Sequence, residues 1–430
     1  MENKKKEFQK LQQTLKSALS LLKPFEQDVL KMRLGLNDKN PASLESIEKT
    51  FNISKKDIRT IEAKAFLKMR RIQKAAFELI EQSAEQGDAD SQNRLGEMYE
   101  SGDGVEQDYE KALAWYTKAA DQGFADAQIR LGVMYFRGNG KENDYTKAFE
   151  WFEKAAKQGN AIAQNNLGIM YENGNGVKQD YTKAFEWYKK SAEQGIADAQ
   201  NNLGIMYAKG DGVKQDYIKA FEWYEKAAEQ NYAAAQNNLG IIYYKGCGVK
   251  QDYTKAFKWF EKAANQGFSD AQFNIGVMYE NGDGLKHDYA KAFEWYKKAA
   301  EQNDTYAQNN LGWMYENGYG VEQNYEKAVE WYKKSAEQDD PSAQNNLGRM
   351  YARGTGVKQD SEKAFEWYEK SAQNGQAEAQ FNLGIMYEYG DGVKQDYAKA
   401  VEWFTKSVEQ GYYKAIKLAE ELERIMSGEK

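Results

Sequence analysis

The chain has 430 residues and a formal net charge of −7, with one cysteine and one histidine. One cysteine excludes a disulfide framework within the chain, and one histidine with one cysteine excludes the usual four-ligand structural zinc site. Residues 1–80 hold 18 Lys/Arg against 10 Asp/Glu, a net +8, so the rest of the chain carries −15. A basic head on an acidic body limits nucleic-acid contact to the head.

The first segment, residues 1–72, is predicted to form a small helical domain. Residues 8–22 have apolar side chains at helical spacing, and residues 25–34 form a second helix that ends at a glycine. After a polar loop at residues 37–42, a short helix follows over residues 44–51. Its preceding residue is Ser43, a favourable N-cap.

A tight turn at Asn52 and Ile53 leads into the next helix. Ser54 is its predicted N-cap, and Asp57, three residues on, completes a capping-box pattern. Two helices joined by so short a turn are typical of a helix-turn-helix. A plain helical bundle is the alternative interpretation of the same pattern.

Three segments of this head resemble region four of the sigma-70 family. They are LKPFEQDVLKMRLGL at 22–36, SLESIEKTFNIS at 43–54 and IRTIEAKAFLKMR at 58–70. The resemblance implies a helix-turn-helix that reads promoter DNA and docks on RNA polymerase. Nothing else in the chain resembles the sigma regions that open DNA, so we do not expect a complete sigma factor.

The resemblance also assigns individual positions of the recognition helix. In the family, base edges are read at the positions that correspond to Lys55, Lys56 and Thr60, and phosphate contact corresponds to Arg59 and Lys64. The family's usual residues at the three base-reading positions are Arg, Glu and Gln, so this chain departs at all three. We therefore expect DNA binding by these five residues without recognition of an ordinary promoter sequence.

No glycine or proline lies between Ser54 and Gly87. Residues 76–87 align with the second helix of the repeat described next, which predicts a half-repeat over residues 73–87 that caps the repeat array. The recognition helix then runs straight into this cap, and the head is mounted rigidly. A break near residues 70–73 is the alternative.

Residues 88–411 repeat one 36-residue pattern nine times without an insertion. A glycine recurs in each copy, at Gly96, Gly132, Gly168, Gly204, Gly240, Gly276, Gly312, Gly348 and Gly384. Each copy predicts two helices: the first ends at a G-x-G turn and the second begins after an Asp or Asn cap. Because a glycine inside a helix costs about 1 kcal/mol, we expect two helix backbones to approach closely there. A fixed period of this length predicts an all-α solenoid.

The repeated pattern A-x-A-Q-x-x-L-G-x-M-Y-x-x-G-x-G-V-x-x-D-Y-x-K-A-x-x-W-Y-x-K-A-A-x-Q-G resembles the Sel1-like repeat, a relative of the tetratricopeptide repeat. The resemblance implies a right-handed α-solenoid that serves as a scaffold or adaptor for protein partners, with no catalysis by the repeats. Residues 412–430 are predicted to form the C-terminal capping helix.

Comparison of the nine copies predicts where a protein or peptide partner binds. Most columns are nearly constant, whereas the variable columns of the first helix fall at spacings of three and four and so share one face. In the related repeats this face lines a concave groove, and aromatic and Arg side chains suit peptide recognition. Drift at tolerant positions is the alternative explanation. The predicted residues are Ile129, Phe136, Tyr244, Phe273, Tyr306, Trp313, Arg349, Phe381 and Tyr389.

No cluster of residues predicts an enzyme, a cofactor, a metal or a small-molecule substrate. His287 and Cys247 fall in loops of different repeats, and the G-x-G turns lack the preceding strand of a phosphate-binding loop. No apolar run is long enough to span a membrane, and the charged N-terminus lacks the core of a signal peptide, so we expect a cytoplasmic protein. Two interpretations stay open: a DNA- or polymerase-associated regulator, and a purely structural adaptor whose head docks only on protein.

Overall fold

The computed structural model describes residues 23–34, 42–139 and 142–427. Within these ranges every regular element is helical, which confirms the all-α prediction. No helix of the described ranges is both long and apolar enough to cross a bilayer. The chain forms two compact units, residues 1–191 and 192–430. The predicted helix at 8–22 and most of the polar loop at 37–42 lie outside the described residues.

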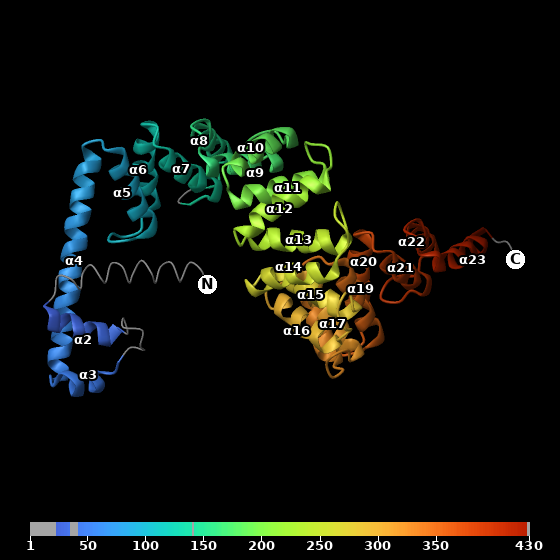
Figure 1. Cartoon of the computed structure of the whole chain (residues 1–430). Coiled ribbons are helices and arrows are strands. Elements are labelled where there is room, and N and C mark those ends of the chain that lie inside the picture. The colour runs from blue at the N-terminus through green and yellow to red at the C-terminus, as the bar shows by residue number, and fades with distance from the viewer. Residues whose placement is uncertain (1–22, 35–41, 140–141, 428–430) are drawn as a thin grey trace. The chain divides into compact units, whose positions relative to one another are not determined.

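In its described residues the head has three helices around one small core. They are α2 (Pro24–Leu34), α3 (Leu44–Phe51) and α4 (Lys55–Glu85) (Figure 1). The buried residues of this core are Val29, Leu30, Ile47, Ile58 and Ile61. These residues come from all three helices, so the short turn between α3 and α4 is fixed by packing on both sides.

The predicted caps of α3 and α4 are confirmed. Ser43 accepts a hydrogen bond from the backbone N–H of Ser46, and Ser54 and Asp57 form a complete capping box. Asn52, in the turn between the helices, has φ of 51° and ψ of 47°, a left-handed conformation that asparagine tolerates better than most residues. The cap and turn residues in the sequence thus determine where α3 begins and ends and where α4 begins.

Helix α4 is continuous over 31 residues and links the head to the repeats. Figure 1 shows it as one long helix (blue) between the head and α5 (Ala89–Ser101). No turn interrupts it at residues 70–73. Rigid mounting of the head stays a prediction, to be checked by the NMR relaxation of head and repeats.

Each of the nine repeats contains two helices, and within each unit successive helices pack on each other, as α5 does on α6 and α6 on α7. The first helices are α5, α7 (Ala125–Arg137), α9 (Ala161–Asn173), α11 (Ala197–Lys209), α13 (Ala233–Lys245), α15 (Ser269–Asn281), α17 (Thr305–Asn317), α19 (Pro341–Arg353) and α21 (Ala377–Tyr389). The second helices are α6 (Tyr109–Asp121), α8 (Tyr145–Lys157), α10 (Tyr181–Glu193), α12 (Tyr217–Glu229), α14 (Tyr253–Asn265), α16 (Tyr289–Ala300), α18 (Tyr325–Ala336), α20 (Ser361–Gln373) and α22 (Tyr397–Glu409).

The ends of the repeat helices follow the predicted cap residues. The side chain of Asp180 accepts a hydrogen bond from the Lys183 backbone N–H, and the equivalent Asp or Asn does the same in every repeat. The first helix α9 ends at Gly174, whose φ of 73° is left-handed. The two helices of a repeat are therefore delimited by local chemistry.

The glycine inside each first helix has a different reason from the one predicted. A Cβ atom on Gly168 would lie 2.5 Å from Cδ1 of Tyr188, which belongs to the second helix of the same repeat. The close neighbour is thus an aromatic ring rather than a second helix backbone. A Tyr or Phe ring occupies this place in all nine repeats.

A buried glutamine connects each repeat to the one before it. In the second repeat, the Gln128 side chain donates to the carbonyl of Ala120 (3.1 Å), in the last turn of the preceding helix, and accepts from Gln158 (2.8 Å). The glutamine thereby adds a side-chain hydrogen bond to a carbonyl at a helix end, which also accepts from the backbone N–H of Gly123 (2.9 Å). The constant Gln of the A-x-A-Q pattern is therefore a hydrogen-bonding residue.

The C-terminal cap differs in detail from the predicted single helix. A 3-10 turn at Tyr413–Ala415 comes first, and α23 (Ile416–Ser427) follows it. Ala415 and Leu422 are buried against the last repeat. The segment thus covers the open end of the α21–α22 pair, as a terminal cap must.

Candidate functional site

The head presents one exposed polar face on the first turns of α4. Lys56, Arg59, Thr60 and Lys64 are all exposed, whereas Ile58 and Ile61 on the opposite side are buried in the head core. The exposed residues follow helical spacing, so they share one side of the helix. The Thr60 hydroxyl donates to the Lys56 carbonyl (2.8 Å). Four of the five residues predicted to meet DNA are thus brought together on one surface.

Lys55, the fifth residue, is held by acidic residues of α3. Its ammonium group lies 2.8 Å from Glu45 Oε1, and its backbone N–H donates to Glu48 Oε1 (3.3 Å). The hydrogen bond to Glu45 raises the pKa of Lys55, and the same contact lowers the pKa of Glu45. Sequence analysis missed both glutamates, although they are the only acidic residues of α3. They make the beginning of α4 less basic than its sequence indicates.

An arginine of α2 connects this helix to α4. Arg33 on α2 donates through Nε to Glu62 Oε1 of α4 (2.8 Å) and through Nη1 to the carbonyl of Ala42 (2.9 Å). Both side chains of the ion pair are about one-third exposed or less. The pair fixes the direction in which α4 leaves the head core.

The second candidate surface is the first-helix face, which we define as the surface that carries the nine predicted partner-binding residues. Tyr306 and Tyr389 are 66% and 64% exposed. The other seven are half-buried and contact neighbouring repeats or the second helix of their own repeat: Ile129, Phe136, Tyr244, Phe273, Trp313, Arg349 and Phe381.

Several of these side chains already have partners within the chain. Arg349 forms an ion pair with Glu316 of the preceding repeat (2.8 Å). The Tyr244 hydroxyl donates to Asp283 Oδ2 (2.5 Å). Trp313 packs against Tyr319, with ring centroids 4.8 Å apart. These contacts hold the three side chains in defined positions.

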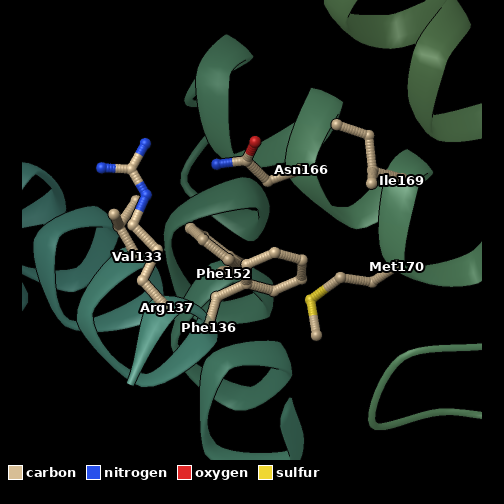
Figure 2. Close-up of a pocket in the computed structure, with 7 residues that line it drawn as sticks. All are labelled: Val133, Phe136, Arg137, Phe152, Asn166, Ile169 and Met170. Atoms are coloured by element: carbon tan, nitrogen blue, oxygen red, sulfur yellow. The ribbon is translucent and has the colours of Figure 1, made fainter. Parts of the chain in front are cut away.

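One pocket on this face lies between α7 and α9. It has a volume of about 180 Å³ and is lined by Val133, Phe136, Arg137, Phe152, Asn166, Ile169 and Met170. Figure 2 shows the rings of Phe136 and Phe152 close together, with the polar groups of Arg137 and Asn166 towards one edge. The pocket is thus apolar with two polar groups at its edge.

Sequence analysis missed a ladder of asparagines that joins neighbouring first helices. In residues 192–430 an Asn of one repeat donates to an Asn of the repeat before it: Asn238 to Asn201, Asn274 to Asn237, Asn346 to Asn309 and Asn382 to Asn345, at 2.9–3.1 Å. The signal in the sequence was the near-constant Q-N-N-L-G run of the repeats.

Among the residues that the structure describes, four buried side-chain oxygens lack a hydrogen-bond partner, and three of them mark departures from the repeat pattern. Asn93 faces a repeat with Arg130 in place of the ladder Asn, and Gln344 belongs to a repeat that has Asn374 in place of Gln. Glu388 belongs to a repeat with Phe404 in place of the usual Tyr. Nothing in the structure explains the fourth, Gln380.

The family comparison matches the repeats from end to end. The model described as "Sel1 repeat" matches residues 72–88 and then consecutive 36-residue stretches from 89–124 to 377–412. This chain belongs to the Sel1 repeat family. Its Sel1 repeats form a helical scaffold for protein interaction, and the resemblance stated from the sequence is confirmed.

The solved structure of a Sel1 repeat protein agrees with this assignment. A Sel1 repeat protein from Oxalobacter formigenes is 34% identical, over 73% of this chain and 91% of that chain, with a TM-score of 0.58. A protective antigen of uropathogenic Escherichia coli with an SLR fold is also 34% identical, over 81% of this chain and 93% of that chain, with a TM-score of 0.41.

A second relationship covers only a short stretch. The RNA polymerase sigma factor SigA1 of Synechococcus elongatus is 47% identical over 60 residues, which are 14% of this chain and 15% of that protein. The similarity to sigma factors agrees with a small helix-turn-helix region, and it spans about a seventh of the sigma factor's length.

Proposed function

We propose that this chain is a transcription-associated adaptor, in which the helix-turn-helix head binds DNA or RNA polymerase and the Sel1 repeats recruit a protein partner. The observation that carries the proposal is the exposed face of Lys56, Arg59, Thr60 and Lys64 on a capped helix. A helix of this kind, held against a second helix by a short turn, has the shape that enters a DNA groove. The short similarity to sigma factors supports the same role.

Phosphate contact by Arg59 and Lys64 gives the proposal a quantitative test. Fluorescence anisotropy of the full chain on duplex DNA of random sequence, over a range of salt concentrations, measures the affinity and its salt dependence. Each phosphate contact contributes about 0.9 to the slope of log affinity against log salt. The variant Arg59→Ala/Lys64→Ala should bind more weakly and reduce the slope by about 1.8.

A matched control keeps the change in net charge the same. Lys214 and Lys250 are exposed lysines in loops of the solenoid, and Lys214→Ala/Lys250→Ala removes the same two charges far along the chain from the head. The control should leave the affinity and the slope unchanged. Equal loss in both variants would mean that net charge, and not the head, governs binding.

The alternative is an adaptor whose head docks only on protein. The observation that favours it is the pair of acidic residues, Glu45 and Glu48, which hold Lys55 at the beginning of α4. Carboxylates at that end of the helix repel phosphate. Absence of salt-dependent DNA binding by the full chain would support this alternative, and a pull-down of purified RNA polymerase core would then test the docking role.

A further inference from the structure

The nine repeats fall into two classes according to two adjacent residues at the end of the first helix. In five repeats a glutamate is followed by a residue without positive charge: Glu100–Ser101, Glu172–Asn173, Glu280–Asn281, Glu316–Asn317 and Glu388–Tyr389. In the other four the glutamate is absent and the next residue is always a cation: Phe136–Arg137, Ala208–Lys209, Tyr244–Lys245 and Ala352–Arg353. We call these the acidic repeats and the basic repeats.

In four of the five acidic repeats the glutamate is bound by a buried tyrosine from the second helix; the fifth, with Glu388, has Phe404 at that position. Tyr116 donates to Glu100 (2.6 Å), and Tyr332 to Glu316 (2.7 Å), and two further repeats have the same pair. In two basic repeats the tyrosine is replaced by phenylalanine, and these are the two in which an aromatic residue replaces the glutamate. The hydroxyl and its carboxylate acceptor are therefore absent together in both.

These two repeats contain equivalent pockets. The first is the pocket at Phe136 described above, with Phe152 as its buried wall. The second, of about 170 Å³, is lined by Ile241, Tyr244, Lys245, Phe260, Asn274 and Val277, each 108 residues after its counterpart in the first. Each unit of the chain thus contains one copy of this pocket. Both copies have an aromatic residue in place of the glutamate, a cation after it and a phenylalanine in place of the tyrosine.

The edges of both pockets are positively charged or amide-bearing. Arg137 and Lys245 are exposed, and neither has an ion-pair partner among the described residues. Asn166 and Asn274 are half-buried on the next first helix. The Asn274 amide donates to Asn237, whereas Asn166 has Ile129 in place of a ladder partner. A cation and an amide beside an apolar hollow match a carboxylate and a peptide backbone beside an apolar side chain.

We propose that each of these two pockets binds one large apolar side chain of an acidic peptide segment in a partner protein. The inference rests on the proposed role of the solenoid in partner recruitment and adds the chemistry of the partner. A volume of 170–180 Å³ compares with the engineered cavity of about 150 Å³ that binds benzene, so Leu, Met or Phe fits. The unpaired cations at the edge select segments with Asp or Glu next to the apolar residue.

The acidic repeats add to the preference of acidic peptide segments for the two pockets. They present a carboxylate at the position where the two pocket repeats present an aromatic ring, and a carboxylate there repels an acidic segment. The pocket at Tyr244 is less favourable for an acidic segment than the pocket at Phe136. The Asp283 carboxylate accepts a hydrogen bond from the Tyr244 hydroxyl and places a negative charge beside the pocket. The pocket at Phe136 therefore binds such a segment more tightly.

The test uses a library of random 12-residue peptides displayed on phage and selected on the full chain. Enriched peptides should contain Leu, Met or Phe next to Asp or Glu. Labelled synthetic copies are then measured by anisotropy against the variant Phe136→Glu/Arg137→Asn/Phe152→Tyr. This variant converts the pocket repeat into the acidic pattern that the chain already folds in four other repeats, so its fold is retained. Binding should weaken about tenfold or more.

The matched control converts a basic repeat that lacks the aromatic pair. Ala208→Glu/Lys209→Asn changes the net charge by the same amount and leaves both pockets intact, so it should leave binding unchanged. Equal weakening in the control would show that the charge of the face, rather than the pocket, selects the peptide. Enriched peptides without this pattern, unchanged binding to the converted repeat, or no enrichment would each overturn the pocket proposal. None of these outcomes affects DNA binding by the head, which is measured separately.

Discussion

The glycine inside each first helix offers a sharp test of how the repeats pack. Gly312 lies under Tyr332, a ring with no exposed surface, and a Cβ atom at Gly312 would be 2.5 Å from Cδ1 of that ring. Carbon atoms prefer about 3.5–4.0 Å, so the ring must move by about 1 Å. The ring is enclosed by its own cluster, and its hydroxyl donates to Glu316. It has little freedom to move.

Two effects of Gly312→Ala oppose each other. Alanine favours the helix by about 1 kcal/mol relative to glycine, whereas overpacking a close-packed site costs about 1–3 kcal/mol. With an enclosed ring we expect the upper part of that range, and hence a net loss of about 1–2 kcal/mol in the free energy of opening. Because 1.4 kcal/mol is a factor of ten, protected amides of α17 and α18 should exchange about tenfold faster.

Hydrogen exchange of the intact chain, followed by mass spectrometry, resolves this change repeat by repeat. The decisive control is Gly312→Ala in a Tyr332→Ala background, where no ring lies above the new methyl group. There the same substitution should slow exchange relative to its parent, because only the helix preference remains. Slower or unchanged exchange with Tyr332 in place would refute the packing argument.

Two further predictions concern the head and the last repeat. Ser54→Ala removes the capping box with Asp57 and should cost about 1 kcal/mol, visible as faster exchange in the first turns of α4 and nowhere else in the head. Burial, helped by the charge of Glu421, raises the pKa of Glu388, so the folded state holds this proton more tightly than the unfolded state. The last repeat should therefore lose stability as the pH rises from the usual glutamate pKa through the raised one. Phe404→Tyr supplies the missing hydroxyl and should flatten that dependence; equal slopes in amide protection against pH for both proteins would contradict this account.

The sequence predicted the helices of the repeats because their ends are local. A cap acid such as Asp180 and a left-handed glycine such as Gly174 act within a few residues, so their positions in the sequence determine the boundaries. The same holds for Ser43 and Ser54 in the head. The predicted partner-binding and DNA-binding residues stay predictions, since exposure alone does not identify a ligand.

Contacts between residues far apart in the sequence were not predicted from the sequence. The glycine column indicated a close neighbour but not that this neighbour is a ring twenty residues further along, because a side chain's direction depends on how two helices pack. The pairing of Lys55 with Glu45 was hidden in the same way. The sequence contained the residues of these pairs, without the geometry that joins them.

The sequence by itself determined the period, the helix pairs and the family, because each depends on a pattern that repeats every 36 residues or on caps that act locally. Only the tertiary structure decided which columns become hydrogen bonds, which become ion pairs and which leave an open pocket. Those outcomes depend on pairs of residues on different helices: Glu316 and Tyr332 form a hydrogen bond in one repeat, whereas Phe136 and Phe152 at the same two positions line a pocket in another.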